Sequence, residues 1–315
     1  MVGAWMIPAL ASGGLAAGDY QFDLTVGGAK RLYVLHVPPH TDQQLLPIVM
    51  MLHGAGGTAR NAARSYGWCE KADAEAFVAV FPQGLPVRPN RPAWFLTNPN
   101  VWNDLSGRTP GPRNQIDDIA FLSAVLDDVQ NKCNIDRRRI YVTGFSNGAS
   151  MSFTVASRMA DRVAAVGPVS GHFWPHAEAA TRAVPLMLVV GTDDPLNPID
   201  GGLARNPWGP KTNKPPMQQD VDMWLKHIGA PAAPYQVDDR GGILSRAYVN
   251  LQGCPMEYVV LSNQGHEWAG HQRVLPRLLT GPNRMDFNVT DQLWHFFQQQ
   301  TLPALGPAGA DLPVH

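Results

Sequence analysis

The segment Arg139-Ile-Tyr-Val-Thr-Gly-Phe-Ser-Asn-Gly-Ala-Ser-Met151 decides the fold of this chain. It begins with an apolar, β-branched run, Ile140 to Thr143, which is typical of a buried strand. A helix-like run follows, and Gly144 and Gly148 lie two residues on either side of Ser146. A Gly-x-Ser-x-Gly pattern between a strand and a helix is typical of a nucleophile elbow. Because side chains at the two glycines would collide with backbone, the pattern predicts a strained turn that exposes the Ser146 hydroxyl.

The rest of the chain alternates between strand-like and helix-like segments, with short connections between most of them. An alternating pair at 20–26 and 31–38 predicts an antiparallel hairpin. Continuous apolar runs predict buried strands at 47–54, 76–84, 162–167, 184–190 and 256–261. Helical periodicity is found at 58–75, 117–129, 216–228 and 289–299. We therefore expect an α/β fold with a mainly parallel central sheet and helices on both faces.

Composition excludes several function classes. The chain has 315 residues, of which 44% are hydrophobic, so it can bury a large core. Its formal net charge of −1 gives no general attraction to nucleic acid or to anionic membranes. No run approaches the roughly 20 apolar residues that a membrane-spanning helix needs. We expect neither a nucleic-acid partner nor a transmembrane segment.

One catalytic domain is expected over residues 19–300, since no repeat or linker divides the chain. Two regions rich in Pro, Asn and Gly, 85–114 and 197–216, are expected to be functional insertion loops. Residues 1–18 are expected to be a loose N-terminus or the remnant of a signal peptide, and residues 301–315 a disordered tail. The three cysteines, Cys69, Cys133 and Cys254, permit at most one disulfide, match no metal-binding spacing, and leave the pairing open.

A serine needs a base and an acid before it can act as a nucleophile at neutral pH. Function in open α/β sheets gathers at the carboxyl ends of strands, and His266 directly follows the last predicted strand. It also satisfies the chain order Ser, acid, His, whereas His53 precedes the serine; His271 is the main competitor. The acid is expected in Gly191-Thr-Asp-Asp-Pro195, and the residues alone leave Asp193 and Asp194 open.

Ester cleavage also needs donors for the oxyanion. The backbone N–H of Asn147, which follows the serine, is one candidate. The second should come from the glycine-rich loop His53-Gly-Ala-Gly-Gly57, where Ala55 or Gly56 is the expected donor.

Tryptophans in or beside the predicted loops suggest a surface for an aryl ester or a repeating polyester. The expected substrate-binding residues are Trp102, Trp208, Trp268 and His53, with Trp94 and Trp174 nearby. Asp117 and Asp118 open a predicted helix, and we expect them to complement the helix dipole rather than to act in catalysis.

Five motifs together resemble the polyhydroxybutyrate depolymerase family of esterases, which is related to feruloyl and acetylxylan esterases. They are Leu52–Gly57, Arg139–Ala149, Pro168–Gly171, Gly191–Pro198 and Gly265–Trp268. The resemblance implies an α/β-hydrolase fold, a Ser146–Asp194–His266 triad, no metal and no organic cofactor. It also implies export, because many members of the family are exported. Two features depart from the pattern: Ala269 follows Trp268 where the family usually has proline, and no polymer-binding module is recognisable.

The expected function is that of a serine carboxylic-ester hydrolase that works through an acyl-enzyme. Hydroxyalkanoate oligomers or polyesters are the first choice of substrate. The alternatives are a feruloyl, aryl or acetylxylan-type esterase, and a non-catalytic binding protein on a hydrolase scaffold. The last alternative is disfavoured because such proteins usually lose a member of the triad, and all three are present here.

Overall fold

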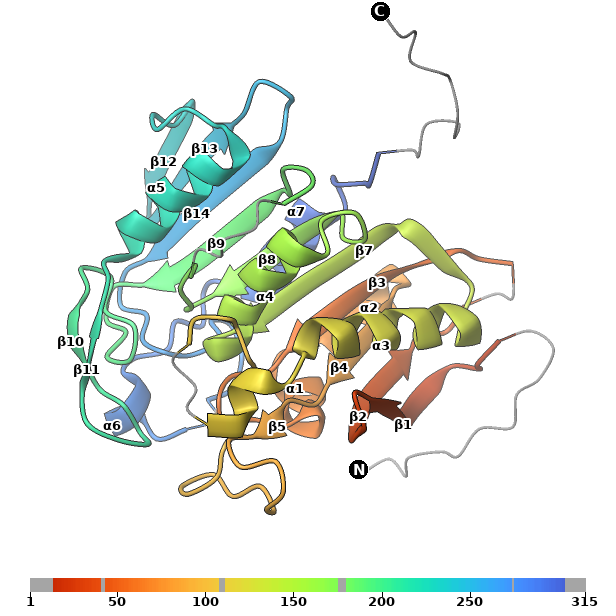
Figure 1. Ribbon diagram of the computed structural model, residues 1–315. Helices are drawn as coiled ribbons and strands as arrows, with labels where there is room; N and C mark the ends of the chain where they lie inside the picture. The colour runs from red at the N-terminus through yellow and green to blue at the C-terminus, as the bar shows by residue number, and fades with distance from the viewer. Residues whose placement is uncertain (1–13, 41–42, 108–110, 175–179, 274, 304–315) are drawn as a thin grey trace, which may run out of the picture.

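The computed structural model describes residues 14–40, 43–107, 111–174, 180–273 and 275–303. Its centre is a ten-stranded sheet with the strand order β1-β2-β4-β3-β7-β8-β9-β14-β13-β12 (Figure 1). The strands of this sheet are β1 (Gly18–Val26), β2 (Ala29–Val37), β3 (Leu46–Leu52), β4 (Val78–Pro82), β7 (Ile135–Phe145), β8 (Ala165–Val169), β9 (Leu186–Gly191), β12 (Gln236–Arg240), β13 (Ile243–Val249) and β14 (Pro255–Leu261).

The middle of the sheet is parallel and its two edges are antiparallel. All pairings from β4 through β3, β7, β8 and β9 to β14 are parallel. The hairpin of β1 and β2 forms one edge as predicted, with Val26 opposite Ala29 across a turn of two glycines. The hairpin of β12 and β13, which forms the other edge, was not predicted. The α/β-hydrolase prediction of a mainly parallel central sheet is confirmed.

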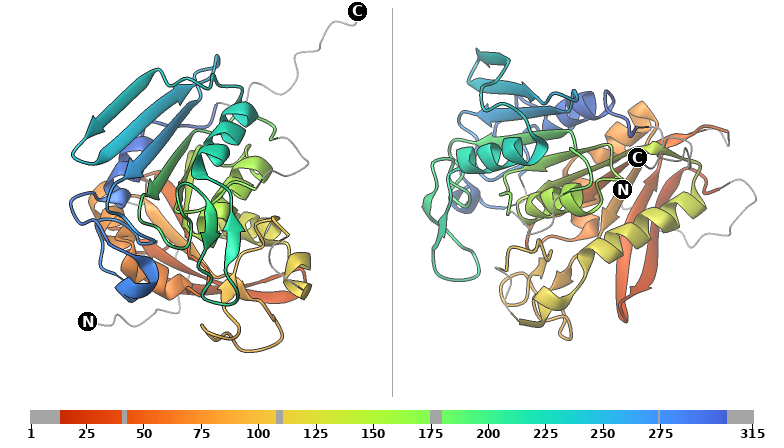
Figure 2. Two further views of the ribbon diagram at one scale, coloured as in Figure 1. Left: turned by 90° about the vertical axis from the view of Figure 1, so that its left-hand side faces the viewer. Right: turned by 45° about the horizontal axis from the view of Figure 1, so that its top comes forward.

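Helices cover both faces of the sheet, as Figures 1 and 2 show. The helices α3 (Asp118–Lys132), α4 (Asn147–Arg158) and α5 (Met217–Ile228) pack on one face, and α1 (Ala59–Ser65), α2 (Trp68–Glu75) and α7 (Val289–Phe297) pack on the other. Strand β3 shows how the sequence builds these two layers. Met50 belongs to the core under α3 and α4, whereas Met51 belongs to the core under α1 and α7. A fully buried parallel strand must be apolar on both faces, which explains its continuous apolar run.

The single helix predicted over 58–75 is two helices, α1 and α2. Gly67 separates them with a φ of +69°, a left-handed conformation that glycine adopts without strain. A Cβ atom at Gly67 would lie 2.1 Å from the ring of His271, so the position is also closed to a side chain. The turn brings α2 back across the edge formed by β1 and β2.

The structured chain begins earlier than the predicted domain. Leu15 is 4% exposed within the core, and its N–H donates to the carbonyl of Lys132 at 2.9 Å. Residues 14–18 are therefore packed against α3 and not loose, because an apolar side chain there finds a place in the core. Residues 1–13 and 304–315, which hold most of the predicted terminus and tail, lie outside the described residues.

Both insertion regions carry small structures of their own. The first contains the paired strands β5 (Leu85–Pro86) and β6 (Asn100–Val101) and the 3₁₀ helix η1 (Gly111–Gln115). The second forms a hairpin of β10 (Gly202–Ala204) and β11 (Thr212–Lys214). The short helix α6 (Arg277–Thr280) lies near the β10–β11 hairpin (Figure 1), and Arg205 donates to the carbonyl of Leu278 in this helix at 2.6 Å.

The cysteines and the helices can be compared with the predictions from composition. All three cysteines lie in the described part of the chain, and each is a free thiol. Among the described residues, no helix has both the length and the apolar character required to cross a membrane.

Both aspartates lie at the start of α3 as predicted, Asp117 as its N-cap and Asp118 in its first turn, but their surroundings differ. The Asp117 carboxylate caps α3 by accepting a hydrogen bond from the N–H of Ala120 at 2.8 Å. Asp118 is instead fully buried and forms ion pairs with two arginines, Arg31 at 2.8 Å and Arg113. Its burial could not be predicted because Arg31 lies 87 residues away in the chain. The cluster anchors the first insertion region to the sheet, since Asp118 also accepts from the N–H of Asn103 at 2.7 Å.

Replacement of Asp118 by asparagine is expected to lower the free energy of unfolding by about 3–5 kcal/mol, because two buried guanidinium groups lose their counter-charge. Urea denaturation measures this loss. Asp117→Asn is the matched control and should change stability by only a few tenths of a kcal/mol, since asparagine caps helices as well as aspartate. Equal stabilities of the two variants would contradict the buried ion-pair assignment.

Candidate active site

The predicted elbow is present between β7 and α4. Ser146 has a φ of +56° and a ψ of −117°, a conformation that is rare for a residue with a side chain. A Cβ atom at Gly144 would lie 2.2 Å from the carbonyl oxygen of Gly148, and one at Gly148 would lie 2.1 Å from that of Leu52. Both glycines are therefore required by the close approach of α4 to strands β3 and β7. The strained turn places Ser146 at the amino terminus of α4.

His266 and Asp194 meet although they are 72 residues apart. The Nδ1–H of His266 donates to Oδ2 of Asp194 at 2.7 Å. His266 lies in the loop after β14 and Asp194 in the loop after β9, and these two strands are parallel neighbours. Both residues are buried, with 4% and 3% exposure. With its Nδ1 proton directed at a carboxylate, the imidazole keeps a lone pair on Nε2.

The loop geometry shows which of the two aspartates, Asp193 or Asp194, is the partner of His266. Asp194 accepts hydrogen bonds on Oδ1 from the N–H groups of Leu196 and Asn197, both at 2.8 Å, which leaves Oδ2 for the imidazole. Asp193 is exposed and its carboxylate accepts from the hydroxyl of Thr192 at 2.6 Å. Only Asp194 therefore faces His266.

The imidazole is also held from the side of the elbow. Its ring packs against the ring of Phe145, with centroids 4.7 Å apart. The N–H of His266 donates to the carbonyl of Thr280 at 2.6 Å. Ser146 and His266 line the same cavity, so the hydroxyl and the imidazole face one space.

Asn147 is fixed by its side chain. Its Oδ1 accepts from the N–H of Trp102 at 2.6 Å, and its Nδ2 donates to the carbonyl of Trp102 at 3.2 Å and to Asp104 at 3.1 Å. Asn147 is the first residue of α4, where backbone N–H groups have no partner within the helix. Its N–H is thus held in place for an incoming negative charge.

Of the two oxyanion donors considered in the glycine-rich loop, the geometry favours Ala55. The N–H of Gly56 already donates to the carbonyl of Asn100 at 2.7 Å, so Gly56 is not available as a donor. The Ala55 N–H forms no hydrogen bond within the described residues. Gly56 has a structural role instead, because its φ is +77° and a Cβ atom there would lie 2.7 Å from the ring of Phe95.

His53 and Trp102 both support this loop, and His53 also lines the cavity that contains Ser146 and His266. Nδ1–H of His53 donates to the carbonyl of Gly54 at 2.8 Å, and its Nε2 accepts from the N–H of Gly84 at 3.0 Å. Trp102 is fully buried, stacks beside His53, and donates from Nε1 to the His53 carbonyl at 2.8 Å. The expectation that Trp102 contacts substrate is not met, since Trp102 lines neither cavity next to Ser146.

Burial gives His53 a pH-dependent effect on stability. It lowers the pKa of His53 from its ordinary value of 6.5 to about 4. In the unfolded chain the ring takes up a proton near pH 6.5, but the folded protein resists it until about pH 4. A depressed histidine pKa therefore favours the fold above pH 6.5, and this contribution is lost as the pH falls from about 6.5 to 4.

We expect His53 alone to remove about 3 kcal/mol of unfolding free energy between pH 7 and pH 4. Urea denaturation at several pH values should show this loss in the wild type. In His53→Gln, whose amide does not titrate, the dependence on pH should be shallower by the same amount. Parallel pH profiles for the two proteins would rule out a buried, neutral His53.

Two cavities open on either side of Ser146. The first, here called the apolar cavity, has a volume of about 310 Å³ and includes His266. Its apolar walls are formed by Phe95, Phe145, Trp208, Trp268 and Leu275. The second, here called the polar cavity, has a volume of about 430 Å³. It is named for the polar side chains of its wall, Asn147, Ser150, His172, Asn197, Arg205 and Asn213, although Val101, Trp174, Leu196, Pro207 and Trp208 line it as well.

Trp208 is the one predicted aromatic residue that lines both cavities. Its Nε1–H donates to the carbonyl of Phe95 at 2.5 Å, and the two rings meet edge to face with centroids 5.6 Å apart. This contact joins the two insertion regions above the site. Trp268 lines the apolar cavity but is 3% exposed and packs against Tyr66. The sequence reasoning missed Phe95, which adjoins the exposed Trp94.

A second buried histidine–aspartate pair lies behind the elbow. Nδ1 of His172 is 2.6 Å from Oδ2 of Asp220, and the His172 N–H donates to the hydroxyl of Ser150 at 3.3 Å. Burial raises the pKa of the Asp220 carboxyl. The two residues are 48 positions apart and belong to no recognisable motif, so only the folded chain brings them together.

A more spacious hollow of about 910 Å³ lies elsewhere on the surface. Half of its twelve lining residues are charged, including Arg137 and Arg138 at the amino end of β7 and Asp161 beyond α4. Ser146 follows the opposite, carboxyl end of β7. The hollow is therefore separate from the site described above, despite its larger volume.

Solved structures share this fold. An S-formylglutathione hydrolase from Agrobacterium tumefaciens aligns with a TM-score of 0.57 over 91% of this chain and 96% of its own, at 12% sequence identity. At that identity the likeness establishes the fold alone.

Two sequence relatives are esterases by name. The chain is 29% identical to the putative esterase NocK of Nocardia uniformis subsp. tsuyamanensis over 57% of this chain and 49% of that protein. It is 32% identical to the bifunctional acetylxylan esterase/xylanase XynS20E of Neocallimastix patriciarum over 48% of this chain and 20% of that protein. The chain thus spans half or less of the length of these two relatives.

The family model described as "Esterase PHB depolymerase" matches residues 31–209, which is more than half of the 315 residues. The match includes the glycine-rich loop, the elbow with Ser146 and the loop with Asp194, and it ends before His266. A match of this extent shows that the chain belongs to the esterase PHB depolymerase family.

Proposed function

We propose that this chain is a serine carboxylic-ester hydrolase with Ser146 as nucleophile, His266 as base and Asp194 as the acid that orients the base. One observation carries the proposal. A buried imidazole, hydrogen-bonded to a carboxylate at 2.7 Å, opens into the same cavity as a serine on a strained elbow. Membership of an esterase family supports the same reaction class.

The reaction begins with attack by the Ser146 hydroxyl on the ester carbonyl. Nε2 of His266 takes the proton, and Asp194 stabilises the imidazolium that forms. The carbonyl oxygen becomes an oxyanion, which accepts hydrogen bonds from the N–H groups of Asn147 and Ala55. The imidazolium then protonates the alcohol oxygen as the ester bond breaks, leaving an acyl-enzyme on Ser146.

Water completes the cycle. His266 removes a proton from a water molecule, which attacks the acyl carbonyl through a second oxyanion at the same two amides. The bond to Ser146 breaks, the serine oxygen recovers its proton from His266, and the carboxylic acid leaves. The two half-reactions together consume one ester and one water molecule.

The two cavities suggest how the ester is oriented. The leaving alcohol must lie within reach of His266, which lines the apolar cavity and not the polar one. We therefore assign the alcohol part of the ester to the apolar cavity and the acyl part to the polar cavity. Ser150 and Asn213 offer hydrogen bonds to a polar acyl group.

This orientation favours short hydroxyalkanoate esters among the substrates considered. A hydroxyacyl group carries a hydroxyl for the polar cavity, and the following unit presents methyl and methylene groups to the aromatic walls of the apolar cavity. The family description, which names polyhydroxybutyrate depolymerases, supports this choice. A feruloyl ester is the alternative, since Trp174 and Trp208 also line the polar cavity and could contact an aromatic acyl group.

A matched set of esters tests the assignment. With the alcohol held constant, a 3-hydroxybutyryl ester should exceed the butyryl ester by about 3–10-fold in kcat/KM, the value of one net hydrogen bond. With 3-hydroxybutyrate held constant, each methylene added from methyl to propyl ester should raise kcat/KM about 4-fold.

The variant Phe95→Ala separates the two effects, because Phe95 lines only the apolar cavity. This variant should reduce the rise in kcat/KM that each added methylene of the alcohol produces. The ratio of kcat/KM between hydroxybutyryl and butyryl esters should stay unchanged. If butyryl esters are preferred to 3-hydroxybutyryl esters, or methyl ferulate to all of them, the substrate assignment is wrong while the reaction class stands.

A further inference from the structure

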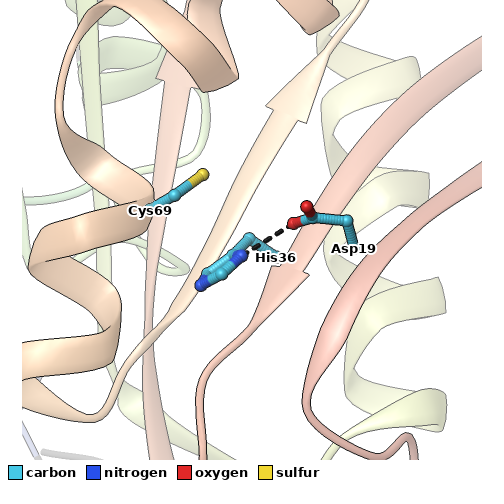
Figure 3. Close-up of side chains that lie close together, drawn as sticks. All are labelled: Asp19, His36 and Cys69. Atoms are coloured by element: carbon cyan, nitrogen blue, oxygen red, sulfur yellow. Dashed lines mark hydrogen bonds and ion pairs between the residues drawn. The ribbon is translucent and has the colours of Figure 1, made fainter. Parts of the chain in front are cut away.

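Four side chains with metal-binding chemistry converge where α2 crosses the edge of the sheet formed by β1 and β2. Asp19 and His36 are directly opposite each other on these two strands. Cys69 and Asp73 lie one helical turn apart on α2, so they share one face of that helix. Figure 3 shows Cys69 projecting from its helix on the side where His36 faces Asp19. In the order of the sheet, β4 and β3 separate this place from β7 and Ser146.

The distances suit a small cation. One potential ligand atom each of Asp19, His36 and Cys69 lie within 4.8 Å of one another. A tetrahedral zinc site with bonds of 2.0–2.3 Å requires ligand atoms about 3.3–3.8 Å apart, so a modest rotation of side chains suffices. Sulfur, imidazole nitrogen and carboxylate oxygen together are typical of Zn²⁺, whereas Mg²⁺ and Ca²⁺ prefer oxygen ligands alone.

The second carboxylate completes a feature found at many metal sites. Nδ1 of His36 lies 2.7 Å from Oδ1 of Asp19, and Nε2 lies 2.9 Å from Oδ1 of Asp73. A metal-ligating histidine usually donates its other ring N–H to a carboxylate, which fixes the ring and raises its basicity. If Nδ1 binds the ion beside Asp19, Asp73 is already in place to accept from Nε2–H.

The Cys69 thiol has only a weak partner to give up. It donates to the carbonyl of Ala63 at 3.3 Å. Cysteine binds metals as the thiolate, so binding of the ion would release the thiol proton.

We propose that Asp19, His36 and Cys69 bind a Zn²⁺ ion, with Asp73 as the hydrogen-bond partner of His36. The site would connect the first hairpin of the sheet to α2, and so tie together two parts of the chain about 30–50 residues apart in sequence. The His36 side chain is 12% exposed, and the Asp19 and Asp73 side chains are 46% and 50% exposed, which leaves the ion a path from solvent. The proposal does not depend on the esterase activity.

Cobalt titration of the full-length chain, after treatment with a chelator, tests the site directly. Co²⁺ bound to a thiolate gives a sulfur-to-metal charge-transfer band in the near ultraviolet. We expect this band to saturate at one Co²⁺ per chain and to disappear when Zn²⁺ is added. Zn²⁺ at a hundredfold excess over its dissociation constant should raise Tm by about 4 °C.

Variants identify the ligands. Cys69→Ser should abolish the band, whereas Cys133→Ser and Cys254→Ser should retain it. Asp73→Asn should keep the band but weaken Co²⁺ binding about 10–100-fold, as loss of a carboxylate behind a ligating histidine usually does. Hydrolysis of a simple ester at the wild-type rate confirms that each variant is folded.

Several results would contradict the proposed Zn²⁺ site. They are the absence of a band at millimolar Co²⁺, a band that survives Cys69→Ser, and an unchanged affinity in Asp73→Asn. If Cys69→Ser does not fold, the cobalt stoichiometry and the Asp73→Asn affinity still decide the question. Loss of ester hydrolysis in Ser146→Ala has no bearing on this result, so the two proposals fail separately.

Discussion

Replacement of Ser146 by alanine is expected to lower kcat for a short p-nitrophenyl ester by about 10⁶, the loss that follows removal of a triad serine in other hydrolases. The reason is chemical, because alanine has no oxygen that could form the acyl-enzyme. Only the binding and oxyanion groups would remain. Stopped or continuous absorbance assays on the purified variant measure the loss.

A second serine on the same helix provides the control. The Ser152 hydroxyl donates to the carbonyl of Gly148 at 2.9 Å within α4 and lines neither cavity beside Ser146. Ser152→Ala should retain activity close to the wild type. If Ser146→Ala also retains activity, Ser146 is not the nucleophile.

Replacement of Asp194 by asparagine is expected to lower kcat by about 10⁴. The amide oxygen can still accept from the N–H groups of Leu196 and Asn197, so the loop should keep its shape. However, asparagine carries no charge to stabilise the imidazolium. If its NH₂ group faces Nδ1, the proton of His266 moves to Nε2. The protonated Nε2 then has no lone pair with which to accept the serine proton.

Asp193→Asn is the matched control for this prediction, since Asp193 adjoins Asp194 but is exposed and faces Thr192. Its kcat should stay close to that of the wild type. A large loss in Asp193→Asn combined with a small loss in Asp194→Asn would reverse the assignment of the acid. Unfolding curves of both variants show whether a loss of activity reflects a loss of fold.

Much of the fold could be predicted because the signals are local. The elbow combines a β-branched strand, two sterically required glycines and a helix within 13 residues, and the structure reproduces each part. The buried strands could be predicted because each of them is a continuous apolar run. By contrast, β12 is largely exposed along its length and carries the polar sequence Gln-Val-Asp-Asp-Arg, so it has no hydrophobic pattern that could mark it as a strand.

The parts of the site that could not be predicted depend on contacts between distant residues. Gly56 looks as suitable an oxyanion donor as Ala55 until Asn100, from the first insertion region, is found to occupy its N–H. Trp102 looks like a surface aromatic until its ring is placed beside His53 beneath the loop. The pair His172–Asp220 and the cluster around His36 have no sequence motif at all, because each joins elements that only the fold brings together.

The convergence of Ser146, His266 and Asp194 is the central claim, and a fluorophosphonate probe tests it most directly. Such a probe reacts with a serine only when a neighbouring base activates it. Peptide mass spectrometry after treatment of the purified chain should find one adduct per chain, on Ser146, and the adduct should form far more slowly in His266→Ala. An adduct on another serine, or none at all in the folded wild-type protein, would contradict the account.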